Sequence, residues 1–250
     1  MTNYFFIVVL FLGSFSFSVE PIALISKSIG NTKYKISSEN DFNSTANINT
    51  PILHGNSIKT KNKSFSQIVY LDDGSTISAF HNTEVTINGV IENRLISKQV
   101  DLAGGIMRVK ILKQFTRLFK LTTPNSELSC QECDFWIDSD QITGDRFYKI
   151  SGNIFLTNPS MNEMLELTND STIISLKDTK MEIYQTTINE NNYLESLMLN
   201  AGVFHEKSKK ELEMISDILD WTTDIQSNVV EIRLKNPLNI ERKIILIYTK

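Results

Sequence analysis

The stretch Ile68–Phe80, IVYLDDGSTISAF, places two adjacent carboxylates, Asp72 and Asp73, between two short apolar runs. Neighbouring carboxylates are a candidate acid–base site, but the same residues also suit a turn. Gly74 accepts the positive φ that a tight turn requires, and Asp73 tolerates it. We therefore interpret Asp73, Gly74 and Ser75 as the structural turn of a β-hairpin, with no catalytic role.

The turn predicts a strand register. A two-residue type I′ turn at Asp73-Gly74 makes Asp72 and Ser75 the first pair of the hairpin. Counting outward from that pair, Tyr70 lies opposite Ile77. Side chains two residues apart share a face of a strand. The predicted apolar face consists of Ile68, Tyr70, Ile77 and Ala79.

The same pattern extends over most of the chain. From about residue 24 to residue 184, short runs rich in Ile, Val, Phe, Tyr and Thr are separated by Gly, Asn, Asp and Pro every eight to twelve residues, which is typical of all-β proteins. At 250 residues, 41% hydrophobic and 22% charged, the chain can bury a sizeable core. The sequence predicts a mainly β protein, built as a solenoid-like or sandwich-like stack of short antiparallel strands.

The pattern changes after about residue 187. Apolar residues at helical spacing predict a helix over 190–202 that ends at Gly202, and Ser208 with Glu211 forms a capping box for a second helix over 209–224. The runs VVEIRL and KIILIYT then predict a terminal β-hairpin. One or two C-terminal helices and a hairpin are therefore expected after the β region.

The first residues resemble a secretory leader. MTNYFFIVVLFLGSFSFS carries an apolar run but no charged side chain, and Ser16 and Ser18 are the small residues that a cleavage site requires. The sequence predicts a signal peptide over 1–18, a β domain over 19–187 and a helical segment with the hairpin over 188–250. Periplasmic or secreted localisation follows, and an uncleaved segment that anchors the chain in a membrane is the alternative.

Two cysteines, Cys130 and Cys133, form a CQEC sequence. An oxidising compartment favours a disulfide, but bridged cysteines need Cα atoms roughly 4.4–6.8 Å apart, whereas three residues of extended strand span about 10 Å. Either the chain bends sharply at Gln131 and Glu132, or both residues are free thiols. The surrounding sequence is typical of strand, which argues against a redox motif at a helix N-terminus.

Four segments of the β region, taken in order, resemble the FecR-like domain, a bacterial extracytoplasmic module. The segments are HGNSIKTKNKSFSQIVYLDDGSTISAFHNTEVTI, VDLAGGIMRVKI, FKLTTPNSELSCQECDFWID and ISGNIFLTN. The matching positions are Gly55, Ile58, Thr60, Ser64, Asp73, Gly74, Ser75, Leu102, Gly105, Val109, Phe119, Thr122 or Thr123, Pro124, Phe135 and Gly152. The likeness covers about residues 24–176, and it departs at Glu132-Cys133, where the family usually has Gly-Thr.

The resemblance implies an all-β module outside the cytoplasm that acts through protein or glycan contacts. The best-known members of the family regulate iron transport through a cytoplasmic segment that contacts a sigma factor. Only about four residues precede the apolar run here, so that role is not expected.

The sequence contains only weak signals of catalysis or of metal or cofactor binding. The three histidines, His54, His81 and His205, are not at metal-ligand spacing, and no phosphate or dinucleotide loop occurs. A net charge of −4 gives no field for nucleic acid, and the five cations from Arg108 to Lys120 are expected on a solvated face. We expect no catalytic, cofactor or metal site.

These observations predict a non-enzymatic FecR-like module in envelope signalling or surface assembly, whose partner is an envelope protein or a glycan. Two alternatives remain from the sequence. One is an envelope protein that binds or hydrolyses polysaccharide, which for hydrolysis needs two carboxylates in one groove. The other is a structural subunit of a surface assembly.

Overall fold

The computed structural model describes residues 20–114, 117–202, 229–235 and 241–247. The chain divides into two compact units after Leu197, and each unit is described by itself. The leader predicted over 1–18 and the second helix predicted over 209–224 lie outside the described residues.

The first unit contains two sheets, A and B, that share one long strand, β9 (Leu95–Ile111). Sheet A runs in the order β4 (Pro51–Ile52), β1 (Ala23–Ile29), β6 (Phe65–Tyr70), β7 (Thr76–Ala79), β9, β12 (Cys133–Asp140), β13 (Gly144–Gly152), β16 (Ser171–Ser175) and β17 (Glu182–Gln185). Sheet B runs in the order β3 (Ser44–Thr45), β2 (Thr32–Lys35), β5 (Asn56–Thr60), β8 (Glu84–Glu92), β9, β10 (Phe119–Thr122), β11 (Glu127–Cys130), β14 (Phe155–Asn158) and β15 (Glu163–Glu166).

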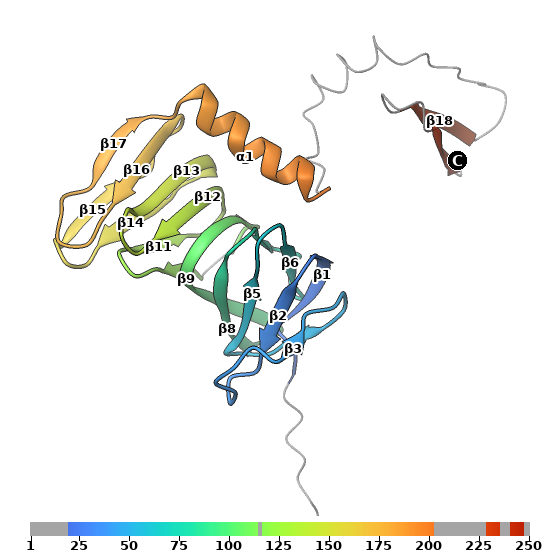
Figure 1. The fold of residues 1–250 in the computed structure, drawn as a ribbon, viewed down its shortest axis with the longest axis horizontal. Helices are drawn as coiled ribbons and strands as arrows, with labels where there is room; N and C mark the ends of the chain where they lie inside the picture. Colours follow the sequence, from blue (N-terminus) through green and yellow to red (C-terminus); the bar gives the residue numbers. More distant parts are fainter. Residues whose placement is uncertain (1–19, 115–116, 203–228, 236–240, 248–250) are drawn as a thin grey trace, which may run out of the picture. The chain divides into compact units, whose positions relative to one another are not determined.

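The chain builds both sheets in turn. The hairpin β10–β11 belongs to sheet B, β12–β13 to sheet A, β14–β15 to sheet B and β16–β17 to sheet A. Each hairpin pairs with the one before it in the same sheet, through β11–β14 and β13–β16, and Figure 1 shows these strands in succession. Among the pairings of the two sheets, only β9–β10 is parallel. The predicted stack of short antiparallel strands is confirmed.

Strand β9 joins the two sheets because it bends at Gly104-Gly105. Its first half pairs with β8 in sheet B, and its second half pairs with β7 and β12 in sheet A. Gly105 has a φ of 105°, and a Cβ there would lie 2.5 Å from the Cα of Thr83. Glycine is therefore required both by the backbone conformation and by the close approach of the neighbouring chain.

The core lies between the sheets. Alternate residues point inward, so Phe135, Ile137 and Phe147 of sheet A share one buried cluster with Leu121 and Leu156 of sheet B. The face predicted for the hairpin is confirmed, and its side chains are fully buried: Ile68, Tyr70, Ile77 and Ala79.

The helix predicted over 190–202 is α1 (Ile188–Asn200), and it is followed by Gly202 with a φ of 59°. In the second unit, β18 (Val229–Lys235) and β19 (Glu241–Ile247) form the predicted terminal hairpin. Within the residues that the structure describes, no helix is both long enough and apolar enough to cross a bilayer.

Candidate functional site

The loop between β6 and β7 differs from the predicted two-residue turn. Val69 pairs with Thr76, and the Tyr70 amide donates to the Ser75 carbonyl at 2.9 Å. Four residues, 71–74, therefore form the loop, and the predicted pairing of Tyr70 with Ile77 is wrong by two positions. A shift of two residues leaves every side chain on the same face, which is why the buried face was still predicted correctly.

Asp73 organises this loop. Its carboxylate accepts hydrogen bonds from the Ser75 amide at 2.8 Å and from the Ser75 hydroxyl at 2.9 Å. The Ser75 hydroxyl in turn accepts the Leu112 amide at 3.0 Å, and Gly74 has a φ of 77°. Asp73 is thus a turn residue, in the way that aspartates commonly are, and it also links the loop to the end of β9.

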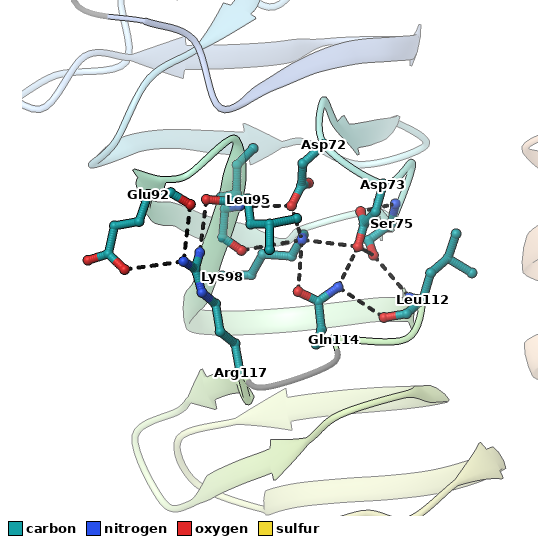
Figure 2. Close-up of polar contacts among 10 residues, drawn as sticks. Asp72, Asp73, Ser75, Glu92, Leu95, Lys98, Leu112, Gln114 and Arg117 are labelled. Carbon is teal, nitrogen blue, oxygen red and sulfur yellow. Dashed lines mark hydrogen bonds and ion pairs between the residues drawn. The ribbon is translucent and has the colours of Figure 1, made fainter.

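Asp72 has a different partner, the buried Lys98 of β9. The Nζ atom of Lys98 lies 2.8 Å from Oδ2 of Asp72 and 3.1 Å from Oδ2 of Asp73. The Lys98 side chain is 0% exposed and that of Asp72 is 3% exposed. A buried ion pair therefore connects the β6–β7 loop of sheet A to the part of β9 that lies in sheet B, as Figure 2 shows.

Two further residues complete what we call the Lys98 cluster, which consists of Tyr70, Asp72, Asp73, Lys98 and Gln114. Lys98 donates to Oε1 of Gln114 at 3.1 Å, and the Gln114 amide donates to Asp73. The ammonium also lies 5.2 Å from the centre of the Tyr70 ring, within the range of a cation–π contact. The ammonium is therefore surrounded on several sides by acceptors and a π face.

The electrostatics of the cluster follow from this geometry. Burial acts to raise the pKa of Asp73, but hydrogen bonds from Ser75 and Lys98 outweigh it and hold the pKa below its ordinary value. Burial, helped by the negative charges of Asp72 and Asp73, raises the pKa of Tyr70 well above its ordinary value. Tyr70 is therefore neutral, and Asp73 is charged, at any physiological pH.

Two buried atoms of the cluster have no hydrogen-bond partner among the described residues: Oδ1 of Asp72 and the hydroxyl of Tyr70. Oδ2 of Asp72, in contrast, accepts both Lys98 and the Ile96 amide, each at 2.8 Å. An unpaired buried carboxylate oxygen is costly. The arrangement therefore leaves one oxygen of Asp72 held by two donors and the other bare.

Another cation, Arg117, contacts the β8–β9 turn, which precedes the Lys98 strand. Arg117 donates to the carbonyl oxygens of Leu95 and Glu92 at 2.9 and 3.1 Å, so it ties down the β8–β9 turn (Figure 2). Asp73, at 20% side-chain exposure, is the member of the ionic set that reaches the surface. The Nζ of Lys98 is itself buried, and the contacts of the cluster link the β6–β7 loop to β9 and to Gln114.

The CQEC sequence forms the corner at which the chain passes from sheet B to sheet A. Cys130 ends β11 and Cys133 begins β12, and a disulfide joins them across a Cα–Cα distance of 6.2 Å. The sharp bend that a bridge requires falls at residues 131–132. Gly152 lies against this corner, because a Cβ there would be 2.1 Å from the Glu132 carbonyl oxygen.

Arg108 corrects the expectation of a solvated cationic face. Its guanidinium donates to both carboxylate oxygens of Asp134, at 2.8 and 2.7 Å, and it lies 5.8 Å from the Trp136 ring. Arg108 is 7% exposed and Trp136 is 4% exposed, so this part of the outer face of sheet A is covered. Lys110 and Lys120 are exposed, as expected.

Helix α1 is fixed to sheet A by a capping box and a tyrosine contact, which the apolar spacing of the helix does not predict. Thr187 and Glu190 form a capping box: the Thr187 hydroxyl accepts the Glu190 amide at 3.2 Å, and Glu190 accepts the Thr187 amide at 2.8 Å. Tyr184 of β17 donates its hydroxyl to Glu190 at 2.6 Å. Burial opposes ionisation, but the hydrogen bonds from Tyr184 and Thr187 hold the pKa of Glu190 below its ordinary value.

Two of the three histidines lie within the described residues. His54 accepts the Gly89 amide at 3.2 Å through Nδ1, whereas His81 stands after the end of β7, and His205 lies outside the described residues. Among the described residues, no group of three or more His, Cys, Asp and Glu side chains is placed to hold a metal ion.

The buried lysine had a sequence signal of its own. Lys98 alternates in phase with Ile96, Val100 and Leu102, all of which point into the core. A cation on an inward-facing strand position needs a buried acidic partner. The adjacent acids Asp72 and Asp73 were the candidates for that partner.

Comparisons with known proteins give distant likenesses. No family model and no curated protein matches the chain. Two crystal structures of a "putative anti-sigma factor" from Parabacteroides distasonis ATCC 8503 are similar to it. The structure at 2.50 Å resolution has 13% identity and a TM-score of 0.46, over 54% of this chain and 62% of that chain. The structure at 1.65 Å has 12% identity and a TM-score of 0.46, over 55% and 63%. This chain thus spans less than two thirds of either structure, and the likeness is too distant to assign a function.

Proposed function

We propose that the chain is a non-enzymatic, FecR-like module that acts outside the cytoplasm, in envelope signalling or surface assembly, through contact with an envelope protein or a glycan. One observation carries the proposal. The residues that resemble the FecR-like motifs, taken in chain order, occupy successive strands, turns and corners of one continuous two-sheet stack: the apolar ones are buried in strands and the Gly, Asp, Ser and Thr residues lie mostly at or next to turns.

The motif residues have specific structural tasks. The Thr60 hydroxyl bonds the Phe80 carbonyl, and the Ser64 hydroxyl accepts the Asn31 amide at 2.8 Å. Thr123 donates to Asp145 at 2.5 Å. Together with the Asp73 turn, these contacts explain why hydroxyl and acidic residues recur at these positions of the pattern. They support a family architecture built on such corners.

The same contacts favour a binding role over an enzymatic one. Asp72 and Asp73 were the strongest candidates for paired catalytic carboxylates, and both are engaged by Lys98 or by Ser75. A glycoside hydrolase needs its two carboxylates free to face a sugar. The engagement of this pair supports the proposal that the module acts by contact.

The sheet edges offer surfaces for such contact. Strand β15 ends sheet B and strand β17 ends sheet A, and Met164 and Ile183 on these strands are 66% and 52% exposed. Edge strands present unpaired backbone groups, to which a partner strand can add.

Cell fractionation followed by chemical cross-linking tests the proposal. The full chain with a C-terminal tag is expressed in a bacterium, and a variant without residues 2–18 is the matched control. The full chain is expected in the periplasmic, envelope or secreted fraction, cross-linked there to an envelope protein or glycan, whereas the control stays in the cytoplasm. Recovery of the full chain from the cytoplasm alone would contradict the proposal.

A further inference from the structure

The Lys98 cluster brings together the parts of a self-condensing pair. A primary amine, the Nζ of Lys98, lies 2.8 Å from the Asp72 carboxylate, and both side chains are almost fully buried. A second carboxylate, Asp73, lies 3.1 Å from the same amine. An amine and a carboxylate held in contact away from water are the two groups that form an amide when one water molecule is lost, and both are held in place here.

We propose that Lys98 and Asp72 condense to an intramolecular amide, which joins the β6–β7 loop covalently to β9. The Nζ atom forms a bond with Cγ of Asp72, the bond from Cγ to Oδ1 breaks, and one water molecule leaves. That water carries two protons of the original ammonium and the Oδ1 oxygen, so atoms and charge balance without an oxidant or a cofactor. This inference rests on the cluster alone and does not depend on the proposed function.

The two oxygens of Asp72 already have the roles that this step requires. Oδ2 accepts the Ile96 amide at 2.8 Å, and this donor stabilises the negative charge that develops on the oxygen during attack. Oδ1 has no partner among the described residues, so its departure breaks no hydrogen bond. The amide product therefore keeps the held oxygen and loses the bare one.

Asp73 is the positioning and proton-transfer residue. Its Oδ2 atom accepts a hydrogen bond from Nζ, which aims the amine and gives its proton a place to go on the way to the leaving oxygen. Its 20% exposure gives the water a route to solvent. Gln114 holds both Lys98 and Asp73, so it keeps the two groups in register.

Condensation also relieves the cost of the site. The buried ion pair becomes a neutral amide, and the unpaired carboxylate oxygen is removed. Both changes favour the product, because buried charges and unpaired buried polar atoms are each costly in free energy. Asp73 loses its cation in the same step, and the donors from Ser75 and Gln114 remain on its carboxylate.

Mass spectrometry of the purified full chain tests the inference. The intact mass, measured after the disulfide is reduced, is expected to be lower than the sequence mass by one water molecule. Trypsin should then fail to cleave after Lys98, and the peptides Ser64–Arg94 and Leu95–Arg108 should appear as one branched species. Fragmentation should place the branch at Asp72.

Three variants provide the controls. Lys98→Arg keeps the positive charge, but a guanidinium does not condense, so the branched species should be absent from a folded protein. Asp72→Asn can form the same amide by release of ammonia, so its final mass should equal that of the condensed wild type. Asp73→Asn should slow the appearance of the branch about 10²–10⁴-fold, the usual value of a proton-transfer residue.

Two outcomes would overturn the inference. One is a folded wild-type protein with its full sequence mass and with tryptic cleavage after Lys98, which would make the pair an ion pair only. The other is loss of ammonia from the wild type, which would place the bond at Gln114.

Discussion

Removal of the Lys98 ammonium should be among the most destabilising single changes in the first unit. Lys98→Met keeps the length of the side chain but leaves the Asp72 carboxylate, at 3% exposure, with the Ile96 amide as its remaining partner. Loss of one partner of a buried ion pair costs about 3–5 kcal/mol. For a unit of this size, each kcal/mol lowers Tm by about 2–4 °C, so a decrease of roughly 6–20 °C is expected. Lys98→Met also removes the proposed amide, which makes the loss larger.

Chemical denaturation monitored by circular dichroism measures this loss, and Lys59→Met is the matched control. Lys59 also pairs with an acid, Glu84, at 2.7 Å, but these side chains are 47% and 35% exposed. Exposed pairs contribute about 0–1 kcal/mol. Two variants of equal stability would refute the reasoning, because burial would then make no difference to the value of the pair.

Three further outcomes are expected. Gly152→Ala should lower the free energy of unfolding, measured by urea denaturation, by roughly 3–5 kcal/mol, because a positive φ is combined with a carbonyl oxygen 2.1 Å from the new Cβ. The control Gly74→Ala, with open space around it, should lower it by about 1–2 kcal/mol, and similar losses for the two variants would argue against the close approach at Gly152. Thr187→Ala should lower stability by about 0.5–2 kcal/mol through loss of the N-cap bond to Glu190, and unchanged stability and helix content would count against the capping box. Because the pKa of Asp73 lies below its ordinary value of 3.8, its contribution is complete above about pH 5 and is lost as the pH falls through the lower folded value; a pH titration of Tm that shows the Asp73→Asn difference vanishing between pH 6 and 8 would contradict this.

The hairpin shows what local pattern can and cannot predict. Alternation along Ile68–Tyr70 and Ile77–Ala79 identified the buried face, and that conclusion survives because it depends only on parity. The register failed because the loop is shaped by Lys98, which is 26 residues away from Asp72 in sequence. Turn propensity at Asp73-Gly74 contains no information about that partner.

The burial of Arg108 on the outer face of sheet A could not be predicted from the sequence, for a related reason. In sequence, Arg108 and Lys110 look alike, since both alternate with apolar residues. In the structure, Arg108 pairs with Asp134 and lies beside Trp136 on the strand next to it, while Lys110 is exposed. In the β9–β12 register Asp134 lies opposite Lys110 and Trp136 lies opposite Arg108, so it is the side-chain contacts of Arg108 with Asp134 and Trp136 that distinguish the two cations.

The start of α1 was easier to predict from the sequence. Thr187 and Glu190 have the T-x-x-E spacing of a capping box, which places the helix start at residue 188. The apolar spacing alone predicted a start at residue 190. The sequence did not decide between a disulfide and free thiols at Cys130 and Cys133. The disulfide needs a sharp bend, and the chain bends there because it passes from sheet B to sheet A.

The central claim is that this chain is an exported module, and the N-terminus of the protein recovered from cells tests it most directly. N-terminal sequencing of chain purified from the envelope, periplasmic or secreted fraction is expected to begin near Val19, after cleavage near Ser18. A chain that retains residues 1–18 and is found only in the cytoplasm would contradict the account.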